Sequence, residues 1–439
     1  MEIRTSDLAA AVGGRLVGPD VVVDGATHDS RAVRAGQLFV PVVAERDGHD
    51  FIEAALEAGA GAYLTSMRHE GGTAIEVADT LEALTAAGAH ARSLLPDRVV
   101  GVTGSVGKTS VKDLLASALA PRWATASSQR SFNNELGVPL TLLEAPTGTE
   151  AVVVEMGARS TGHIAALCRV ARPTVGIVTR VAAAHLEVFG TIDDVALAKG
   201  ELIEALPPDG TAVLNAEDER VVAMASRSAA PVLTFGAGGD VQATDLRLDD
   251  ELRPRFGITT PWGSAADVQL AVRGRHQATN ALAAAAAALS CGVELDQVVA
   301  GLSAAQLSPW RMDLRRAANG VVVVNDSYNA NPTSMEAALR ALVEIPAATH
   351  VALLGAMAEL GDSSLADHAA TAALAAELGV RVVQFQTEHY GPGPTAWTMR
   401  EAAELLGDLG GGAALLVKGS RVAGLDEVAA HLLDVVFSS

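Results

Sequence analysis

Short apolar runs alternate with amphipathic stretches along most of the chain. In the middle of the sequence, β-branched apolar runs are separated by helical periodicity, and they lie at 99–102, 152–154, 175–178 and 212–214. Short runs of this kind are typical of strands that are buried on both faces. The alternation predicts a doubly wound, mainly parallel α/β sheet, whose ligands gather beyond the carboxyl ends of the strands.

The flanking segments predict two further α/β units. Before residue 95 the pattern indicates helices over 6–12 and 51–60 and a strand over 38–43. After Ser308-Pro309-Trp310, strand signals resume at 321–324, 351–354, 382–385 and 414–417. A chain of 439 residues suits about three domains. We therefore expect a small N-terminal domain (1–95), a central domain (96–312) and a C-terminal domain (313–439).

Composition favours a soluble cytoplasmic protein. Hydrophobic residues make up 49% of the chain, enough for several cores. The alanine-rich run 281–289 is far shorter than the roughly 20 residues that a membrane span needs, and Met1 to Gly14 lacks the apolar core of a signal peptide. Cys168 and Cys291 both lie in apolar-periodic stretches, so we expect buried thiols in a reducing compartment rather than a disulfide.

The net charge of −20 argues against a nucleic-acid partner, because phosphate backbones are bound by broad basic surfaces. A small anionic substrate needs only a local group of cations. Of the 32 basic residues only four are lysine, which indicates positions where a compact or deprotonatable amine is required. They are Lys108, Lys112, Lys199 and Lys418.

The segment 101–110 predicts a loop that binds phosphate. It follows an apolar strand and leads into a helix, and its glycines let backbone N–H groups turn toward an anion. Lys108 can reach the outer phosphates and the Thr109 hydroxyl can bind magnesium. Val102 stands where the general pattern has glycine, so an ordinary glycine turn is the alternative. The loop residues are Thr103, Gly104, Ser105, Val106, Gly107, Lys108, Thr109 and Ser110.

Polar residues follow the neighbouring predicted strands. Glu155 comes directly after the 152–154 run and suits a magnesium ion, which prefers oxygen ligands. His185 and Glu187 follow the 175–178 strand after a short connection. Lys199 lies in a largely apolar helix, where it is either a solvated lysine or a partly buried amine with a lowered pKa that reacts with carbon dioxide.

Several other loops suit either a ligand-binding role or a purely structural one. The clusters 28–31 and 46–50 supply Ser, Arg and His side chains that suit a ribose or diphosphate, but they also suit turns with an N-cap at Asp50. Asn280 is either a helix cap or an amide that reads a base edge. Segments 325–332, 355–361 and 418–421 each follow a predicted C-terminal strand, so three polar loops should converge on one sheet edge.

Taken together, these motifs resemble the Mur ligase family over nearly the whole chain. The family-wide matches are 103–109, 155–157, 184–187, 198–201 and 274–280. A second set, at 132–139, 326–332 and 359–361, is similar to the members that attach D-alanyl-D-alanine. The resemblance implies a P-loop central domain, a Rossmann-like C-terminal domain and a small N-terminal domain that receives the UDP end of the substrate.

The implied activity is an ATP-dependent amide ligase of peptidoglycan precursor synthesis that works through an acyl phosphate. Its implied ligands are ATP, Mg²⁺, UDP-N-acetylmuramoyl-tripeptide and D-alanyl-D-alanine, and we expect a monomer. Lysine or diaminopimelate is compatible as the third peptide residue. The resemblance implies Lys108, Lys199 and His185 as catalytic residues and Thr109, Glu155, His185 and a carbamylated Lys199 as magnesium ligands. It further implies Asn280, Arg311, Asp326 and Tyr328 at the nucleotide, and Ser30, Arg31, His49, Asn133, Asn134, Asn329 and Asn331 at the substrate.

Four positions depart from the family pattern, namely Arg180, Ala182, Gln277 and Ala356. The alternatives are another muramoyl ligase, a ligase that joins glutamate to folate, and a non-catalytic nucleotide-binding scaffold. The loops at 29–31 and 48–50 argue against folate. The presence of Lys108, Glu155, His185 and Lys199 argues against the scaffold.

Overall fold

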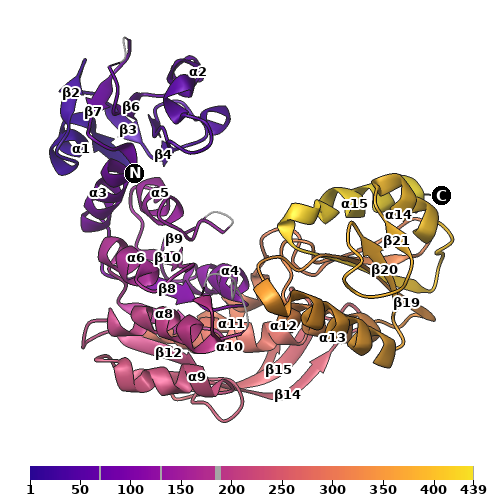
Figure 1. The fold of residues 1–439 in the computed structure, drawn as a ribbon. Coiled ribbons are helices and arrows are strands. Elements are labelled where there is room, and N and C mark those ends of the chain that lie inside the picture. Colours follow the sequence, from indigo (N-terminus) through magenta and orange to yellow (C-terminus); the bar gives the residue numbers. More distant parts are fainter. Residues whose placement is uncertain (69–70, 129–130, 183–188, 439) are drawn as a thin grey trace.

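The computed structural model describes residues 1–68, 71–128, 131–182 and 189–438. The chain forms three lobes, each built on its own main sheet (Figure 1). The N-terminal and C-terminal lobes stand apart from each other, and both adjoin the central one. This arrangement confirms the predicted three-part α/β architecture, whereas the exact domain boundaries at 95 and 312 remain a proposal.

The central sheet has six parallel strands in the order β13-β12-β11-β8-β10-β9. The strands are β8 (Val99–Thr103), β9 (Thr125–Ser127), β10 (Ala151–Glu155), β11 (Val175–Val178), β12 (Thr211–Asn215) and β13 (Val232–Phe235). All four predicted strand runs are present. Their side chains are buried on both faces, which is why the runs are apolar throughout.

Helices cover both faces of this sheet, as the doubly wound prediction requires. One face packs on α4 (Lys108–Leu119), α10 (His276–Ser290) and α11 (Leu295–Ala304). The other packs on α5 (Gly137–Glu144), α6 (His163–Ala171) and α8 (Ile192–Glu204). The short helix α9 (Glu219–Ala223) follows β12. The core of this second face continues into the N-terminal lobe, so the two lobes share one hydrophobic cluster.

A three-stranded antiparallel sheet interrupts the predicted alternation of strands and helices. It consists of β14 (Gln242–Leu248), β15 (Pro254–Thr260) and β16 (Gly263–Gln269), in that order. Phe256, Ile258 and Val268 bury its inner face against the α10 side of the central lobe. Its outer positions are polar and partly exposed, so these strands lack the continuous apolar runs that marked the parallel ones.

The N-terminal lobe contains a five-stranded sheet in the order β2-β7-β6-β5-β4 and a separate β1-β3 pair. Its strands are β1 (Glu2–Arg4), β2 (Arg15–Val17), β3 (Val22–Asp24), β4 (Ala26–Thr27), β5 (Leu38–Phe39), β6 (Ala62–Thr65) and β7 (Ala74–Glu76). Its helices are α1 (Thr5–Ala11), α2 (Ile52–Glu57) and α3 (Thr80–Ser93). The helices predicted over 6–12 and 51–60 are confirmed, but the predicted 38–43 strand is only the two-residue β5.

The C-terminal sheet has the order β17-β18-β22-β19-β20-β21. Its strands are β17 (Asp313–Arg316), β18 (Val322–Asn325), β19 (Thr349–Gly355), β20 (Arg381–Phe385), β21 (Thr395–Ala396) and β22 (Ala413–Lys418). All pairings are parallel except that of β17, an edge strand the sequence did not reveal. Helices α12 (Pro332–Val343) and α13 (Ser364–Glu377) cover one face, and α14 (Met399–Leu406) and α15 (Leu425–His431) cover the other.

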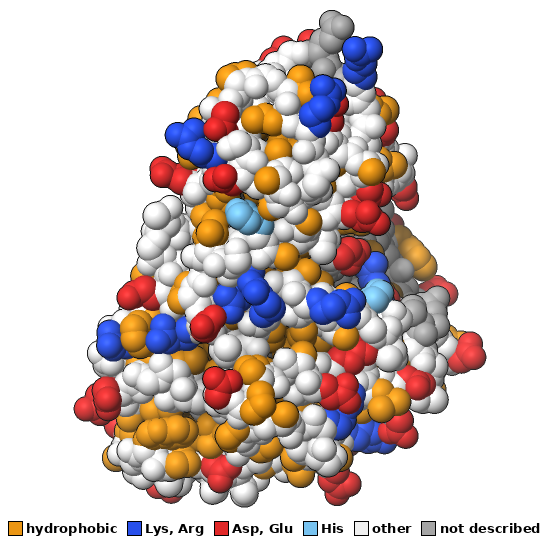
Figure 2. All heavy atoms as spheres, turned by 90° about the vertical axis from the view of Figure 1, so that its left-hand side faces the viewer, with side chains coloured by type: hydrophobic (Ala, Val, Ile, Leu, Met, Phe, Trp, Pro, Cys, Tyr) orange, Lys and Arg blue, Asp and Glu red, His pale blue; other side chains and the backbone are white. Residues whose placement is uncertain are grey.

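Cys168 is buried and Cys291 is half-buried, and neither forms a disulfide. The prediction of a buried thiol is therefore confirmed for Cys168, whereas Cys291 is only partly buried. Within the described ranges, no helix is both long and apolar enough to cross a membrane. On one side of the molecule, acidic and basic side chains are interspersed, with a short band of basic ones at mid-height (Figure 2).

Candidate functional site

The phosphate-type loop lies between the carboxyl end of β8 and the first residue of α4. Gly104 and Gly107 both have positive φ, at 148° and 82°. A Cβ on Gly104 would lie 1.9 Å from Thr179 Oγ1, and one on Gly107 would lie 2.8 Å from Asn280 Oδ1. Glycine is therefore required at both positions by backbone conformation and by space. The N-terminus of the twelve-residue α4 faces the same loop and favours an anion there.

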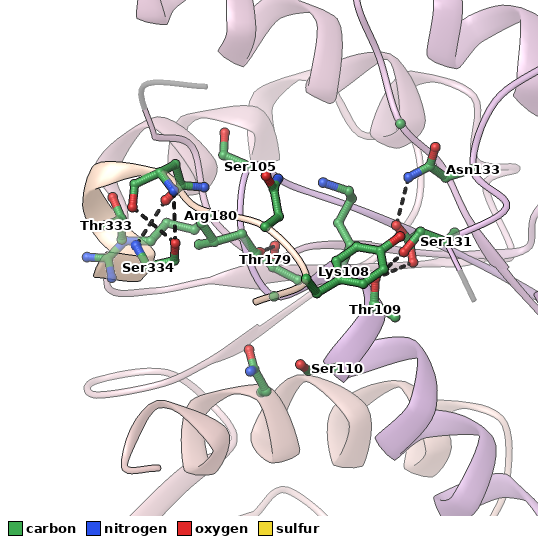
Figure 3. Close-up of a pocket in the computed structure, with 18 of the residues that line it drawn as sticks. Ser105, Lys108, Thr109, Ser110, Ser131, Asn133, Thr179, Arg180, Thr333 and Ser334 are labelled. Atoms are coloured by element: carbon green, nitrogen blue, oxygen red, sulfur yellow. Dashed lines mark hydrogen bonds between the residues drawn. The ribbon is translucent and has the colours of Figure 1, made fainter. Parts of the chain in front are cut away.

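Lys108 begins α4, and its Nζ donates to Gly104 O at 2.8 Å, so its amine lies over the loop. Burial lowers the pKa of Lys108, nearby Glu155 opposes this shift, and the positive charge of Arg311 adds to it. Figure 3 shows Lys108 beside Thr109, Ser131 and Asn133, with Thr333 and Ser334 on the other side of the pocket.

Oxygen atoms from three segments meet next to Lys108. Thr109 Oγ1 donates to Glu155 Oε2 at 2.7 Å and lies 3.1 Å from Ser131 Oγ. Asn133 Nδ2 donates to Glu155 Oε1 at 2.8 Å, and Glu155 is buried at the end of β10. Hydroxyl and carboxylate oxygens in this arrangement fit a hard cation such as Mg²⁺. The third predicted magnesium ligand, His185, lies outside the described residues, as does Glu187.

Lys199 is buried in α8 with 3% of its surface exposed, which excludes the solvated reading. Burial lowers the pKa of Lys199 well below its ordinary value, and the positive charge of Lys108 lowers it further. A lowered pKa increases the fraction of neutral, nucleophilic amine. The burial of Lys199 therefore favours the chemical state that carbamylation requires.

The loop opens into a cavity of about 970 Å³ at the seam between the central and C-terminal lobes. Most of the predicted site residues line it, on both sides of the seam. From the central lobe these are Ser105, Val106, Gly107, Lys108, Thr109, Ser110, Asn133, Asn134, Glu155, Lys199 and Asn280. From the linker and C-terminal lobe they are Arg311, Asp326, Tyr328, Asn329 and Asn331. Thr103 and Gly104 are not among the lining residues; Thr103 is the buried last residue of β8, and Gly104 follows it.

The seam holds the residues predicted at the nucleotide. The Arg311 guanidinium stacks over the Tyr328 ring at 4.3 Å, and its buried Nε has no hydrogen-bond partner among the described residues. An unpartnered buried donor beside a phosphate-type loop fits an anionic ligand. Asn280 is the fifth residue of α10, so it is not a helix cap, and its Nδ2 donates to Gln277 Oε1 at 2.8 Å.

The predicted N-terminal substrate residues lie away from this cavity. Arg31 is exposed and donates to both carboxylate oxygens of Asp29, at 2.9 and 2.8 Å. His49 is buried, with Nδ1 2.6 Å from Asp47 Oδ1 and Nε2 accepting from the Ser66 N–H at 3.1 Å. Both nitrogens of His49 are thus engaged within the lobe, and Ser30 and Arg31 are the more accessible candidates. The alternative with an N-cap at Asp50 is not realised, because Asp47 caps the turn Gly48–Phe51 and Phe51 is the N-cap residue of α2.

The site also contains Thr179, which the sequence analysis did not single out. Thr179 Oγ1 donates to Val106 O at 2.6 Å and so holds the phosphate-type loop against the end of β11. Its position directly after the 175–178 run could have identified Thr179 as a site residue, because ligands bind beyond the carboxyl ends of such strands. Arg180, the bulky departure from the family pattern, also lines the cavity, and its carbonyl accepts from Ser105 N at 2.7 Å. The Arg180 substitution therefore leaves the backbone support of the loop in place.

A cavity with a phosphate-type loop on one wall and a second α/β domain on the other defines a P-loop enzyme that holds its nucleotide between domains. Comparison with known proteins narrows this class. The family models "Mur ligase middle domain" and "Mur ligase, glutamate ligase domain" match residues 102–288 and 310–436. The chain belongs to the Mur ligase family.

Similar proteins extend over nearly the whole chain. The UDP-N-acetylmuramoyl-tripeptide–D-alanyl-D-alanine ligase of Mycobacterium tuberculosis (strain CDC 1551 / Oshkosh) is 38% identical, covering 99% of this chain and 98% of the relative. A crystal structure of MurF from Acinetobacter baumannii is 30% identical, with a TM-score of 0.89 and 99% of both chains covered. MurF ligase from Thermotoga maritima in complex with ADP is 28% identical, with a TM-score of 0.83, covering 94% of this chain and 98% of that one.

Proposed function

We propose that this protein is an ATP-dependent ligase that joins D-alanyl-D-alanine to UDP-N-acetylmuramoyl-tripeptide in peptidoglycan precursor synthesis. The observation that carries the proposal is a single cavity lined from both sides of the seam. The central lobe contributes Lys108, Glu155 and Lys199, and the linker and C-terminal lobe contribute Arg311 and Asp326. Support comes from the relatives of that name, which match this chain along almost its full length. A cytoplasmic monomer is part of the same proposal.

The reaction proceeds in two steps. The peptide carboxylate attacks the γ-phosphorus of ATP, which forms an acyl phosphate and releases ADP. The amine of D-alanyl-D-alanine then attacks the acyl carbon, which forms the amide and releases phosphate and a proton. Both steps depend on holding reactants in line and offsetting charge on the moving phosphoryl oxygens, so no nucleophilic side chain is needed.

The residues divide by location. Lys108 and the amides of residues 104–109 hold the phosphates, while Asn280, Arg311, Asp326 and Tyr328 hold the remainder of the nucleotide. Thr109 and Glu155, together with His185, would hold Mg²⁺, and a carbamate on Lys199 would help hold a second ion. Magnesium, when bound, neutralises phosphate charge. Asn133, Asn134, Asn329 and Asn331 would contact the peptide and dipeptide. Ser30 and Arg31 would bind the UDP end, and His49 would support their lobe from its buried position.

The carbamate on Lys199 can be tested apart from turnover. Carbon-13 NMR in labelled bicarbonate should show a carbamate signal in the native protein that is lost in Lys199→Ala. We expect this variant to be nearly inactive while its fold survives. Leu197→Ala is the matched control, because Leu197 lies on the same helix and is 54% exposed. Normal turnover by Lys199→Ala would contradict the carbamate role.

The activity itself is tested by phosphate release from ATP and magnesium, with each acceptor omitted in turn. We expect release only when UDP-N-acetylmuramoyl-tripeptide and D-alanyl-D-alanine are both present. Folate with glutamate is the control pair, because a ligase that joins these two is the alternative reading of the same motifs. Release with folate would overturn the substrate assignment, and release with neither pair would favour the non-catalytic scaffold.

A further inference from the structure

Lys418 is a buried lysine that the proposed reaction does not use. It is the last residue of β22 and has 1% of its surface exposed. Its Nζ donates to Asp326 Oδ2 at 2.5 Å and to Asn329 O at 3.0 Å, and it lies 3.4 Å from Asp326 O. Three oxygens of the 326–329 loop thus surround one ammonium group, which has three N–H donors to offer.

Asp326 connects this lysine to the linker between the central and C-terminal lobes. While Oδ2 accepts from Lys418, Oδ1 accepts from the Met312 N–H at 3.1 Å. The carboxylate therefore bridges the end of β22 and the linker backbone. Both Asp326 and Arg311, which precedes Met312, line the cavity.

The linker has a backbone conformation that needs such support. Trp310 and Met312 have φ values of 61° and 53°, in the left-handed region that residues with a Cβ rarely adopt. The C-terminal lobe holds the linker through three further contacts: Tyr328 N donates to Trp310 O at 3.3 Å, Arg421 stacks on Trp310 at 4.4 Å, and Arg311 stacks on Tyr328 at 4.3 Å. Arg311 is presented to the cavity from between the two left-handed residues.

We propose that Lys418 is a positioning residue, whose ammonium group fixes the Asp326 carboxylate and, through it, the linker conformation that presents Arg311 to the nucleotide. The part concerning the nucleotide rests on the proposed function, whereas the part concerning the linker does not. Lysine suits the place because its compact head meets oxygens from several directions. The planar guanidinium of arginine, the basic side chain used almost everywhere else in this chain, lacks that geometry.

The first test is amide hydrogen exchange of the nucleotide-free protein. In Lys418→Met, the Met312 N–H should exchange about tenfold faster or more, because a hydrogen bond to a charged group contributes at least that factor to a local equilibrium. The control is Leu415→Ala, a buried position on the same strand whose side chain belongs to the core on the other face of the sheet, whereas Met312 packs in the core on the α12 side. It should lower overall stability without selectively accelerating exchange at Met312.

The second test is ADP binding by calorimetry, which should be about tenfold weaker or more in Lys418→Met for the same reason. Asp326→Asn, which keeps the side-chain shape, serves where Lys418→Met fails to fold, and it should also accelerate exchange at Met312. If the Met312 amide exchanges in either folded variant at the same rate as in the native protein, the proposal is overturned. Absence of ligase activity in the native protein would overturn the proposed function but leave the exchange result standing.

Discussion

Gly104→Ala tests the idea that the phosphate-type loop has its conformation because glycine alone fits it. Gly104 has a φ of 148°, in a region that is essentially restricted to glycine. The new methyl carbon would also lie 1.9 Å from Thr179 Oγ1, the hydroxyl that donates to Val106 O. The variant must therefore change its backbone, displace Thr179, or do both.

The expected size of the effect follows from these two terms. Backbone in such a region costs about 1–3 kcal/mol for a residue with a Cβ, and losing the Thr179 hydrogen bond costs about 0.5–1.5 kcal/mol. The free protein can relax the loop, but nucleotide binding requires the original conformation. A combined penalty of about 1.5–4.5 kcal/mol would weaken ADP binding by about 10- to 1500-fold, since about 1.4 kcal/mol corresponds to a factor of ten.

Calorimetric titration with ADP measures this loss, and urea unfolding measures stability. Gly148→Ala is the matched control, because Gly148 also has positive φ, at 88°, but its Cβ would meet nothing within 4 Å. That variant should bind ADP normally. Adding Thr179→Ala to Gly104→Ala removes the atom at 1.9 Å and leaves the nearest contacts at 3.1 Å, so it should restore part of the affinity. Native ADP affinity in Gly104→Ala would refute the reasoning.

Two further predictions concern stability. Leu202→Ala should lower the free energy of unfolding in urea by about 2–5 kcal/mol, because Leu202 is fully buried and fills the space over Gly101 and Gly176; a loss below that of exposed Leu197→Ala would contradict this. Burial lowers the pKa of His368 below its ordinary 6.5, and neutral Nε2 accepts from the Met357 N–H at 2.9 Å. The unfolded chain therefore binds more protons, so this contribution to stability is complete above about pH 6.5 and declines as the pH falls. Urea midpoints measured from about pH 7.5 to 5.5 should fall less steeply in His368→Asn than in the native protein, and equal slopes would contradict the assignment.

Much of the fold follows from local sequence. Each of the four apolar runs in the central domain is a parallel strand in the structure. These strands are apolar because helices cover the sheet on both faces and leave no room for polar side chains. The phosphate-type loop was equally readable, since its glycines, Lys108 and Thr109 lie within one continuous segment. The sheet β14 to β16 was not, because its outer face is open to solvent and its apolar positions alternate with polar ones.

Burial and side-chain partners were decided by the tertiary structure. Lys199 and Lys418 stand in comparable apolar surroundings in the sequence, yet one has its pKa lowered by burial and the other donates to Asp326. The sequence suggests His49 as a ligand of the substrate. In the structure, however, Asp47 and Ser66 contact its two ring nitrogens.

The sequence alone determined where the buried parallel strands with continuous apolar runs lie, which loop turns its amides toward phosphate, and which family the chain resembles, because each depends on neighbouring residues. The cavity depends on segments more than 200 residues apart, such as Lys108 and Asp326, and on a linker with left-handed Trp310 and Met312. Those features arise only when the two sheets pack at their seam. Contact energies between distant residues, rather than local backbone preferences, select that arrangement.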